Sequence, residues 1–515
     1  MEVPGPPTHE DAMTTSELSD TSPHQLAAIT AAAAAAAGPL ADTSADERAA
    51  LLHAAADAID GRADDLVAVA HAETALGEAR LRGEVARTTG QLRLFADVVR
   101  EGSYLEAMID TPDPAASPPR PDLRRMLRPL GPVAVFAASN FPFAFSVAGG
   151  DTASALAAGC PVVVKAHPGH PRLSRAVADL VAEALAGAGA PDGTFALVSG
   201  LETGAALVQD PHIRAVGFTG SLAGGRALFD LAAARPDPIP FYGELGSVNP
   251  VVVTAAAAAA RGAEIARGLV GSFTLGVGQF CTKPGVVLVP ADAGMDEHVR
   301  DALDAVGDVG GEMLLPRIAE GFRAGVAELA ARPDVTVVAG SVHQPEGTAA
   351  TAVVLASDVA ALQRAPDVLL AEVFGPVCLL VGYRDHDELD AAVALLPGSL
   401  AMALHAQPEE AAGLAPLLAR LQERAGRVVW NGWPTGVAVT WSQHHGGPWP
   451  ATTAPLHTSV GATAIRRFLR PVVYQDLPAD LLPAALRDDN PLGLLRRVNG
   501  RLTRDPVGGA GAVGR

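Results

Sequence analysis

Cysteine is scarce in this chain, and the few that occur lie far apart. The 515 residues include three cysteines, Cys160, Cys281 and Cys378, and no Cys-x-x-Cys pair. This spacing excludes a disulfide framework and a zinc site built from thiolates. It is typical of a protein from a reducing compartment, so we expect a cytoplasmic location and predict no metal site.

The chain also lacks long hydrophobic runs and an excess of basic charge. Its longest apolar stretches, such as Ala31 to Ala37, consist of alanine, which favours helices more than lipid. The N-terminus lacks the basic-then-apolar pattern of an export signal. A net charge of −19 and a pI near 5.1 argue against nucleic acid or a membrane as partner. The length and a hydrophobic content of 49% instead predict two or more buried cores.

Lysine is almost missing. Among 38 basic residues, Lys165 and Lys283 are the only lysines. A GC-rich genome explains a general bias toward arginine. A compact ammonium that persists at two positions nevertheless indicates places where a planar guanidinium would not serve. Because both lysines lie within the motifs described below, we interpret them as functional.

The first hundred residues read as a disordered start followed by helices. Residues 1–23 are rich in Thr, Ser, Pro and acidic side chains and are predicted to be disordered. Apolar residues then recur at spacings of three and four, which predicts helices. These helices are expected at residues 23–37, 45–59, 63–76 and 81–99.

From residue 133 onward, short apolar strands alternate with helices. Strands are predicted at 133–138, 161–165, 195–199 and 215–219, with helices at 147–158, 173–188, 202–209 and 224–234. This alternation predicts a doubly wound parallel sheet that binds ligands at the carboxyl ends of its strands. A second α/β region is predicted from about 250 to 404, with strands at 286–289, 335–338 and 377–381, and extended segments at 124–129 and 468–474.

Cys281 is a candidate nucleophile. It lies in Gly276-Val277-Gly278-Gln279-Phe280-Cys281-Thr282-Lys283, where glycines allow a substrate to approach the sulfur closely. A nearby cation favours the thiolate, which is the nucleophilic form. The alternative is a buried, inert cysteine. This stretch alone leaves both interpretations open.

Two segments at predicted strand ends are candidates for binding a nucleotide. Lys165 ends a buried strand, although a lysine there can also simply reach solvent. Gly217-Phe218-Thr219-Gly220-Ser221-Leu222-Ala223-Gly224-Gly225 follows a strand and opens a helix, where backbone amides can approach a phosphate. Its spacing is not G-x-G-x-x-G, so a purely structural turn fits equally well.

Three polar side chains beside strands are candidates for proton or oxyanion chemistry. Asn140, before Phe141-Pro142, could donate to an oxyanion or could belong to a turn. Glu244, between two glycines, could act as a general base if partial burial raises its pKa. Glu372 raises the same question, and a plain loop glutamate is the alternative for both.

Six motifs together point to a known family. Asn140-Phe141-Pro142, Lys165, Phe218-Thr219-Gly220-Ser221, Glu244-Leu245-Gly246, Gly278-Gln279-Phe280-Cys281 and Glu372-Val373-Phe374-Gly375-Pro376 occur in this order. From about Leu51 to Pro478 the chain resembles the aldehyde dehydrogenase superfamily. A narrower resemblance, carried by residues 241–250, 278–285, 434–437 and 445–453, is to the 2,5-dioxovalerate (α-ketoglutaric semialdehyde) dehydrogenase branch. That branch also resembles a bacterial NADP-dependent fatty aldehyde dehydrogenase.

The resemblance implies an α/β architecture with three parts. A doubly wound NAD(P)-binding domain would comprise residues 24–110 and 131–248, and an α/β catalytic domain residues 249–465. Residues 111–130 and 466–480 would form a small β oligomerisation flap, followed by a C-terminal tail, 481–515. Because a pair of edge strands is unstable alone, a homodimer or homotetramer is expected.

The resemblance also implies roles for individual residues. Cys281 would attack an aldehyde, Asn140 and the Cys281 N–H would hold the oxyanion, and Glu244 would activate water. The implied cofactor-binding residues are Ser139, Lys165, Phe218, Thr219, Gly220, Ser221, Gly225, Leu245, Gly246, Glu372 and Phe374. The implied substrate-binding residues are Arg87, Phe141, Phe145 and Phe280. We further infer that Lys283 helps to keep the thiol ionised, unless it is a surface lysine.

Cofactor and substrate follow from two positions. Members of this family that prefer NAD commonly carry a glutamate three residues after the strand-end lysine, where this chain has Pro168. NADP is therefore favoured, with NAD left open. We hypothesise that the Arg87 guanidinium binds the carboxylate of 2,5-dioxopentanoate that is remote from the aldehyde. The alternative is that Arg87 is a surface arginine. The alternatives are a broad-specificity or fatty aldehyde dehydrogenase, or a non-catalytic cofactor-binding protein; Glu244 disfavours a CoA-acylating enzyme.

Overall fold

The computed structural model describes residues 18–307 and 309–508, so most of the predicted disordered segment lies outside the described residues. The described part begins with ordered chain, earlier than predicted. The N–H of Thr21 donates to the Ser199 carbonyl (2.9 Å), and the Ser199 hydroxyl donates to the Ser19 carbonyl (2.7 Å). Ser22 caps the first helix through a reciprocal pair of hydrogen bonds with Gln25.

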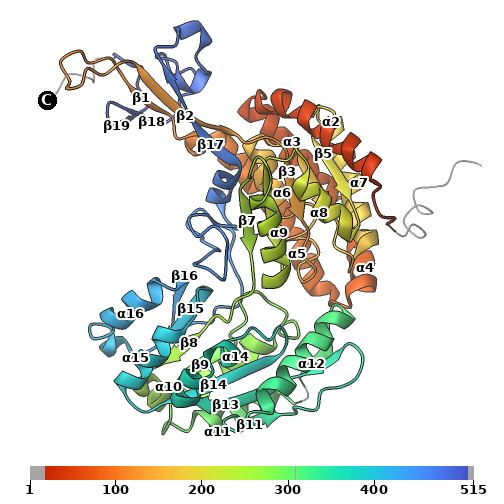
Figure 1. Ribbon diagram of the computed structural model, residues 1–515, viewed down its shortest axis with the longest axis vertical. Coiled ribbons are helices and arrows are strands. Elements are labelled where there is room, and N and C mark those ends of the chain that lie inside the picture. Colours follow the sequence, from red (N-terminus) through yellow and green to blue (C-terminus); the bar gives the residue numbers. More distant parts are fainter. Residues whose placement is uncertain (1–17, 308, 509–515) are drawn as a thin grey trace, which may run out of the picture.

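A five-stranded, all-parallel sheet organises the first domain (Figure 1), in the order β5-β4-β3-β6-β7. Its strands are β3 (Val133–Phe136), β4 (Val162–Lys165), β5 (Phe195–Val198), β6 (Ala215–Thr219) and β7 (Phe241–Glu244). Its helices are α2 (Pro23–Ala41), α3 (Ala45–Asp60), α4 (Ala63–Thr74), α5 (Glu78–Glu101), α6 (Gly150–Ala158), α7 (Pro171–Gly187), α8 (Leu201–Gln209) and α9 (Leu222–Ala233). The predicted doubly wound sheet is confirmed.

Alternate side chains of each strand enter the two cores of this domain. Val133 and Val135 pack among α3, α5, α6 and α7, whereas Ala134 and Phe136 pack among α2, α8 and α9. A strand covered on both faces must be apolar at every position, which explains its continuous hydrophobic run. Because helices cover both faces of the sheet, the carboxyl ends of its strands are where a ligand can reach it.

A seven-stranded sheet organises the second domain, in the order β11-β13-β14-β9-β8-β15-β16, and only β11 is antiparallel to its neighbour. The strands are β8 (Val251–Val253), β9 (Val286–Pro290), β11 (Thr336–Gly340), β13 (Val353–Asp358), β14 (Val377–Tyr383), β15 (Ser399–His405) and β16 (Ala425–Trp430), with a separate pair β10 (Gly310–Glu312) and β12 (Ala349–Thr351). The helices are α10 (Ala255–Thr274), α11 (Met295–Val306), α12 (Pro316–Ala330), α13 (Val359–Arg364), α14 (Pro366–Leu369), α15 (His386–Leu395) and α16 (Ala415–Gln422). This second α/β region also matches the prediction.

The flap differs from the prediction because the C-terminal tail belongs to it. A five-stranded sheet projects from the first domain (Figure 1), with the order β17-β2-β1-β18-β19. Its strands are β1 (Met108–Asp110), β2 (Leu123–Pro129), β17 (Leu469–Gln475), β18 (Arg496–Val498) and β19 (Arg501–Thr503). The predicted boundary at residue 481 is wrong, since β18 pairs with β1 and thereby satisfies an edge that a two-segment flap would leave open.

The predicted end of the catalytic domain at residue 465 is also wrong. The chain returns to the first domain well before that point, and Thr452 forms a bridge with Glu244 on the outer edge of β7. Ile465 and Phe468, at the 3₁₀ segment η3 (Ala462–Phe468), lie in the first-domain core. Unpaired groups on an edge strand attract such a segment, which brings residues 445–459 beside Glu244.

No helix in the described ranges is both long and apolar enough to cross a membrane.

Candidate active site

A cavity of about 430 Å³ lies between the two domains. Its wall combines the carboxyl ends of β3, β6 and β7 with the cysteine loop, α12 and the loop before β14. The predicted site residues on this wall are Ser139, Asn140, Thr219, Gly220, Ser221, Glu244, Leu245, Gly246, Cys281, Glu372 and Phe374. The fold therefore gathers residues from five separated motifs around one space.

Glycines shape the loop that carries Cys281. Gly276 and Gly278 have φ values of 58° and 65°, a region that favours glycine. A Cβ on Gly278 would lie 2.3 Å from the backbone of Gly375, so no other residue fits there. Asn249 stabilises the loop, because its side-chain amide donates to the Cys281 carbonyl (2.8 Å). The sulfur is thus presented by backbone constraints.

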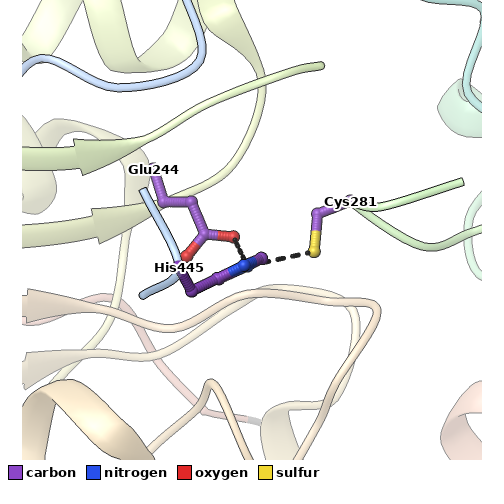
Figure 2. Close-up of side chains that lie close together, drawn as sticks. All are labelled: Glu244, Cys281 and His445. Carbon is purple, nitrogen blue, oxygen red and sulfur yellow. Dashed lines mark hydrogen bonds and ion pairs between the residues drawn. The ribbon is translucent and has the colours of Figure 1, made fainter. Parts of the chain in front are cut away.

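Glu244, Cys281 and His445 converge at the centre of the site (Figure 2). His445 Nε2 lies 2.7 Å from Glu244 Oε1 and 3.5 Å from Cys281 Sγ. The other carboxylate oxygen of Glu244 accepts a short hydrogen bond from the Ser459 hydroxyl. Glu244 and His445 are 3% and 2% exposed, so this network operates away from bulk water.

The pKa values correct two expectations. Burial, followed by the negative charge of Glu244, raises the pKa of the Cys281 thiol, so no resting thiolate is expected. Burial also acts to raise the pKa of Glu244, but His445 and Ser459 more than offset this effect and the pKa is lowered. The prediction of a glutamate with a raised pKa is therefore wrong, because the hydrogen bonds stabilise the carboxylate.

Asn140 lies on the same cavity wall as Cys281, the candidate nucleophile. Its Nδ2 donates to the Gln279 carbonyl (3.1 Å), two residues before Cys281. Arg80 holds the other side of the asparagine by donating to its backbone carbonyl (2.5 Å). Among the described residues, the Cys281 N–H has no acceptor. Two donors are thus placed near the sulfur.

Lys283 is neither a surface lysine nor the cation beside the thiol. It is 3% exposed, and its ammonium donates to the carbonyls of Val373 (3.1 Å) and Val377 (2.8 Å). The cation that favours the Cys281 thiolate is Arg87. Lys283 instead ties the cysteine loop to the chain that carries Glu372.

Three predicted cofactor residues lie off the cavity wall. Phe218 and Gly225 pack behind it, where a Cβ on Gly225 would lie 2.1 Å from the Leu245 side chain. Gly225 therefore permits close packing and does not approach a ligand. Lys165 is partly buried near Gly204, and the charge of Arg317 on the cavity wall lowers its pKa further after burial.

Phe141, Phe145 and Phe280 form an apolar cluster next to Cys281, together with Ala138, Ala144, Val437, Val439 and Val460. The guanidinium carbon of Arg87 lies 5.1 Å from the centroid of Phe145 and 5.8 Å from that of Phe141. The Nε and Nη2 atoms of Arg87 are buried and have no hydrogen-bond partner among residues 18–307 and 309–508. The predicted substrate residues thus lie together, with a cation that lacks an acceptor.

Five further residues were not predicted for the site. His445 and Ser459 complete the Glu244 network, Glu84 lies between Arg80 and Arg87, and His167 and Arg317 line the cavity. Only His445 had a visible signal, since it opens one of the stretches that carry the narrower resemblance. The others sit in ordinary helical or loop patterns, and tertiary packing alone brings them near the site.

Comparison with known proteins agrees with this geometry. The family model described as "Aldehyde dehydrogenase family" matches residues 5–448. The chain belongs to the aldehyde dehydrogenase family.

Two relatives place this aldehyde dehydrogenase more narrowly, and a solved structure shares its fold. The chain is 50% identical to alpha-ketoglutaric semialdehyde dehydrogenase 2 of Azospirillum brasilense, covering 88% of this chain and 87% of the relative. It is 43% identical to alpha-ketoglutaric semialdehyde dehydrogenase of Acinetobacter baylyi, covering 90% and 88%. Aldehyde dehydrogenase C of Pseudomonas syringae, solved with NAD⁺ and octanal, shares the fold with a TM-score of 0.73, 22% identity and coverage of 90% and 91%. The predicted family and branch are confirmed.

This aldehyde dehydrogenase offers a cavity that fits a nicotinamide dinucleotide. Ser221 caps α9 and lies on the cavity wall, so the start of that helix adjoins the cavity, where backbone N–H groups can bind an anion. The Glu372 carboxylate lies against Gly246, where a Cβ would be 2.1 Å from it. Glycines at the wall and a carboxylate for ribose hydroxyls suit such a ligand.

Proposed function

We propose that this aldehyde dehydrogenase oxidises 2,5-dioxopentanoate to 2-oxoglutarate with NADP. The relatives named above support the substrate. The observation that carries the proposal is Arg87, whose Nε and Nη2 are buried, unpaired and beside the aromatic cluster next to Cys281. A guanidinium binds a carboxylate through two parallel hydrogen bonds, and the substrate carries one at the end remote from its aldehyde.

The catalytic network suggests how the nucleophile is generated. Because the pKa of Glu244 is lowered, its carboxylate is ionised and accepts from His445 Nε2–H. The same N–H is 3.5 Å from Cys281 Sγ. Glu244 is therefore the acceptor for the thiol proton at the moment of attack. Once Glu244 is protonated, the His445 N–H can turn to the sulfur and stabilise the thiolate.

Asn140 and the Cys281 N–H stabilise the oxyanion that forms when sulfur adds to the aldehyde. Nicotinamide bound in the cavity supplies the hydride acceptor. Cys281 then holds the acyl group as a thioester. Glu244 first releases the thiol proton to solvent and, as a carboxylate again, takes the proton of an attacking water, while the Ser459 hydroxyl holds the carboxylate in place. The C–S bond of the thioester then breaks, which frees the product carboxylate and returns the Cys281 sulfur.

The position three residues after Lys165 supports NADP as the cofactor. Pro168 places no carboxylate next to Lys165, so a 2′-phosphate meets no repulsion from this position.

The flap supports an oligomer. It exposes Val473 on β17 and Leu502 on β19 (56% and 60%), apolar side chains suited to a homodimer or homotetramer. The three free cysteines suit a cytoplasmic location. Light scattering after gel filtration tests the oligomeric state.

A second candidate function is oxidation of fatty or varied aliphatic aldehydes. The cluster around Phe141, Phe145 and Phe280 supports it, because an alkyl chain needs only apolar walls. Arg87 favours the charged substrate, since an alkyl chain would leave the guanidinium without an acceptor.

A matched pair of aldehydes separates these candidates. We would measure kcat/KM for 2,5-dioxopentanoate, glutaraldehyde and a fatty aldehyde, with NADP and with NAD, for the wild type and Arg87→Leu. Loss of a buried charged pair predicts that Arg87→Leu lowers kcat/KM for 2,5-dioxopentanoate by about 10- to 100-fold and spares glutaraldehyde. An unchanged KM for the charged substrate would refute the clamp, and a preference for the fatty aldehyde would support the second candidate.

A further inference from the structure

Three donor groups gather at one side of the cavity, from both domains. Lys165 ends β4, His167 follows two residues later, and Arg317 is the second residue of α12 in the other domain. His167 and Arg317 line the cavity, as do Gly220 and Ser221 across it. Arg317 Nη2 lies 3.2 Å from His167 Nε2, and the charge of Arg317 also acts to lower the pKa values of Lys165 and His167.

The contact between His167 and Arg317 pairs two donors. The Gly169 N–H donates to His167 Nδ1 (3.0 Å), so the proton of the neutral ring is on Nε2. Nε2 lies 3.2 Å from Arg317 Nη2, which is also a donor. Burial, His170, Arg317 and Lys165 lower the pKa of His167 to about 2, so the ring stays neutral. Two N–H groups therefore face each other without an acceptor between them.

No acidic side chain in the described residues neutralises this cluster by an ion pair. Within the described part of the chain, Arg317 and Lys165 form no salt bridge. Arg172, which follows Lys165 closely in the sequence, does form one, with Glu73. The acidic group that acts on Lys165 is Asp20, which is exposed. A guanidinium and an N–H donor on the cavity wall, with the Lys165 ammonium off the wall nearby, form a site for a doubly charged, oxygen-rich anion.

We propose that His167 and Arg317, with Lys165, bind the 2′-phosphate of NADP and so make NADP selection depend on both domains. The inference rests on the proposed function and deepens it, since Pro168 only removes a repulsion whereas these groups attract. A phosphate between Arg317 and His167 would accept from both N–H groups. NAD has a ribose hydroxyl at this position and would leave the two N–H groups facing each other without an anionic acceptor.

The pyrophosphate common to both cofactors is the other source of phosphate oxygens, and binding measurements separate the two. We would use isothermal titration calorimetry with NADP, NAD, adenosine 2′,5′-bisphosphate and ADP. The variants are Arg317→Ala, Arg317→Lys and His167→Ala. Arg323→Ala is the matched control, because Arg323 lies on the same helix but donates to the Gly347 carbonyl (2.6 Å) outside the cavity.

Arg317→Ala is expected to weaken NADP and adenosine 2′,5′-bisphosphate by about 10- to 100-fold, as for a charge-assisted hydrogen bond. His167→Ala should weaken both less, Arg317→Lys should restore part of the affinity, and NAD and ADP should change by less than about twofold. Equal weakening of all four ligands would assign the cluster to the pyrophosphate and overturn the inference. No change with any ligand would overturn it as well.

The inference and the proposed function can fail separately. If the wild type binds NAD more tightly than NADP while 2,5-dioxopentanoate is oxidised, the phosphate site is wrong and the substrate assignment stands. If the binding pattern is as expected but kcat/KM favours a fatty aldehyde, the phosphate site stands and the substrate is wrong. The calorimetric readout needs no turnover and therefore keeps the two questions apart.

Discussion

The catalytic centre and the ligand-facing walls differ in whether their polar groups have partners. At the centre, both oxygens of Glu244 accept hydrogen bonds, and His445 reaches the carboxylate and the sulfur. On the substrate wall, Arg87 keeps two buried nitrogens without any partner. An unsatisfied buried donor costs about 1–3 kcal/mol. A ligand carboxylate would remove this cost at Arg87, so we interpret the satisfied groups at the centre as chemistry and the unsatisfied guanidinium as recognition.

The largest expected effect breaks the satisfied network. Glu244→Gln removes the acceptor for the thiol proton and for the proton of water. Turnover should fall by about 1,000-fold, as for loss of a general base. Steady-state kcat measures this. Thr453→Ser is the control, because the Thr453 hydroxyl donates to the carbonyl of Phe241 (2.7 Å), which lies on the same strand as Glu244. Near-normal turnover in Glu244→Gln would remove the glutamate from the mechanism.

The pKa of the Cys281 thiol depends on charges from both regions, Glu244 at the centre and Arg87 on the substrate wall. The charge of Glu244 raises the pKa of Cys281 and that of Arg87 lowers it. Alkylation by iodoacetamide requires the thiolate, so its rate rises as pH rises through this pKa. The pH profile should move to lower pH in Glu244→Gln and to higher pH in Arg87→Leu. Mass spectrometry of the Cys281 peptide distinguishes this site from Cys160 and Cys378, and shifts of the opposite sign would contradict the electrostatic account.

A smaller effect is expected where Lys283 joins the two loops. Lys283→Met keeps a long buried side chain but leaves the Val373 and Val377 carbonyls without a donor. Each lost bond costs about 1–3 kcal/mol, so the thermal midpoint should fall. KM for NADP should rise several-fold while kcat changes less, because Glu372 is displaced more than Cys281. A pure loss of kcat would point to a direct role for Lys283 in chemistry.

The smallest effect concerns Glu84, between Arg80 and Arg87. Burial raises the pKa of this carboxyl to about 7, above its ordinary value of 4.5. A raised acid pKa contributes stability at low pH that is lost as pH rises toward the folded value. Between about pH 5 and about pH 8 the wild type should therefore lose about 2 kcal/mol relative to Glu84→Gln. Denaturation at both pH values checks this, with Glu78→Gln, an exposed carboxyl on α5, expected to show no such difference.

The two lysines show how far reading the chain goes. Both were singled out by their rarity, and Lys165 ends a buried strand as predicted. Lys283 lies two residues from Cys281 and still points away from it, toward Val373 and Val377. Sequence distance does not fix the direction of a side chain in a loop whose glycines have positive φ. Proximity along the chain therefore predicted the wrong role.

The alternation of strands and helices and the family could be predicted because hydrophobic patterning is local and the motifs keep their order. Valine runs at 133–136 and 162–165 indicate strands buried on both faces, and the structure has β3 and β4 there. The flap and the end of the second domain could not be predicted. They depend on which distant segment pairs with an open strand edge, as β18 does with β1 and Thr452 with Glu244.

By itself the sequence determined the alternating strands and helices and the family, and it gave Cys281 as a candidate nucleophile, since each depends on short runs of residues that carry their own physical signal. Only the tertiary structure decided which charges face one another. It placed His445 between Glu244 and Cys281, left Arg87 without an acceptor, and set Arg317 against His167 from the opposite domain. Electrostatic effects depend on distance in space and on burial, and neither quantity is written in the order of the residues.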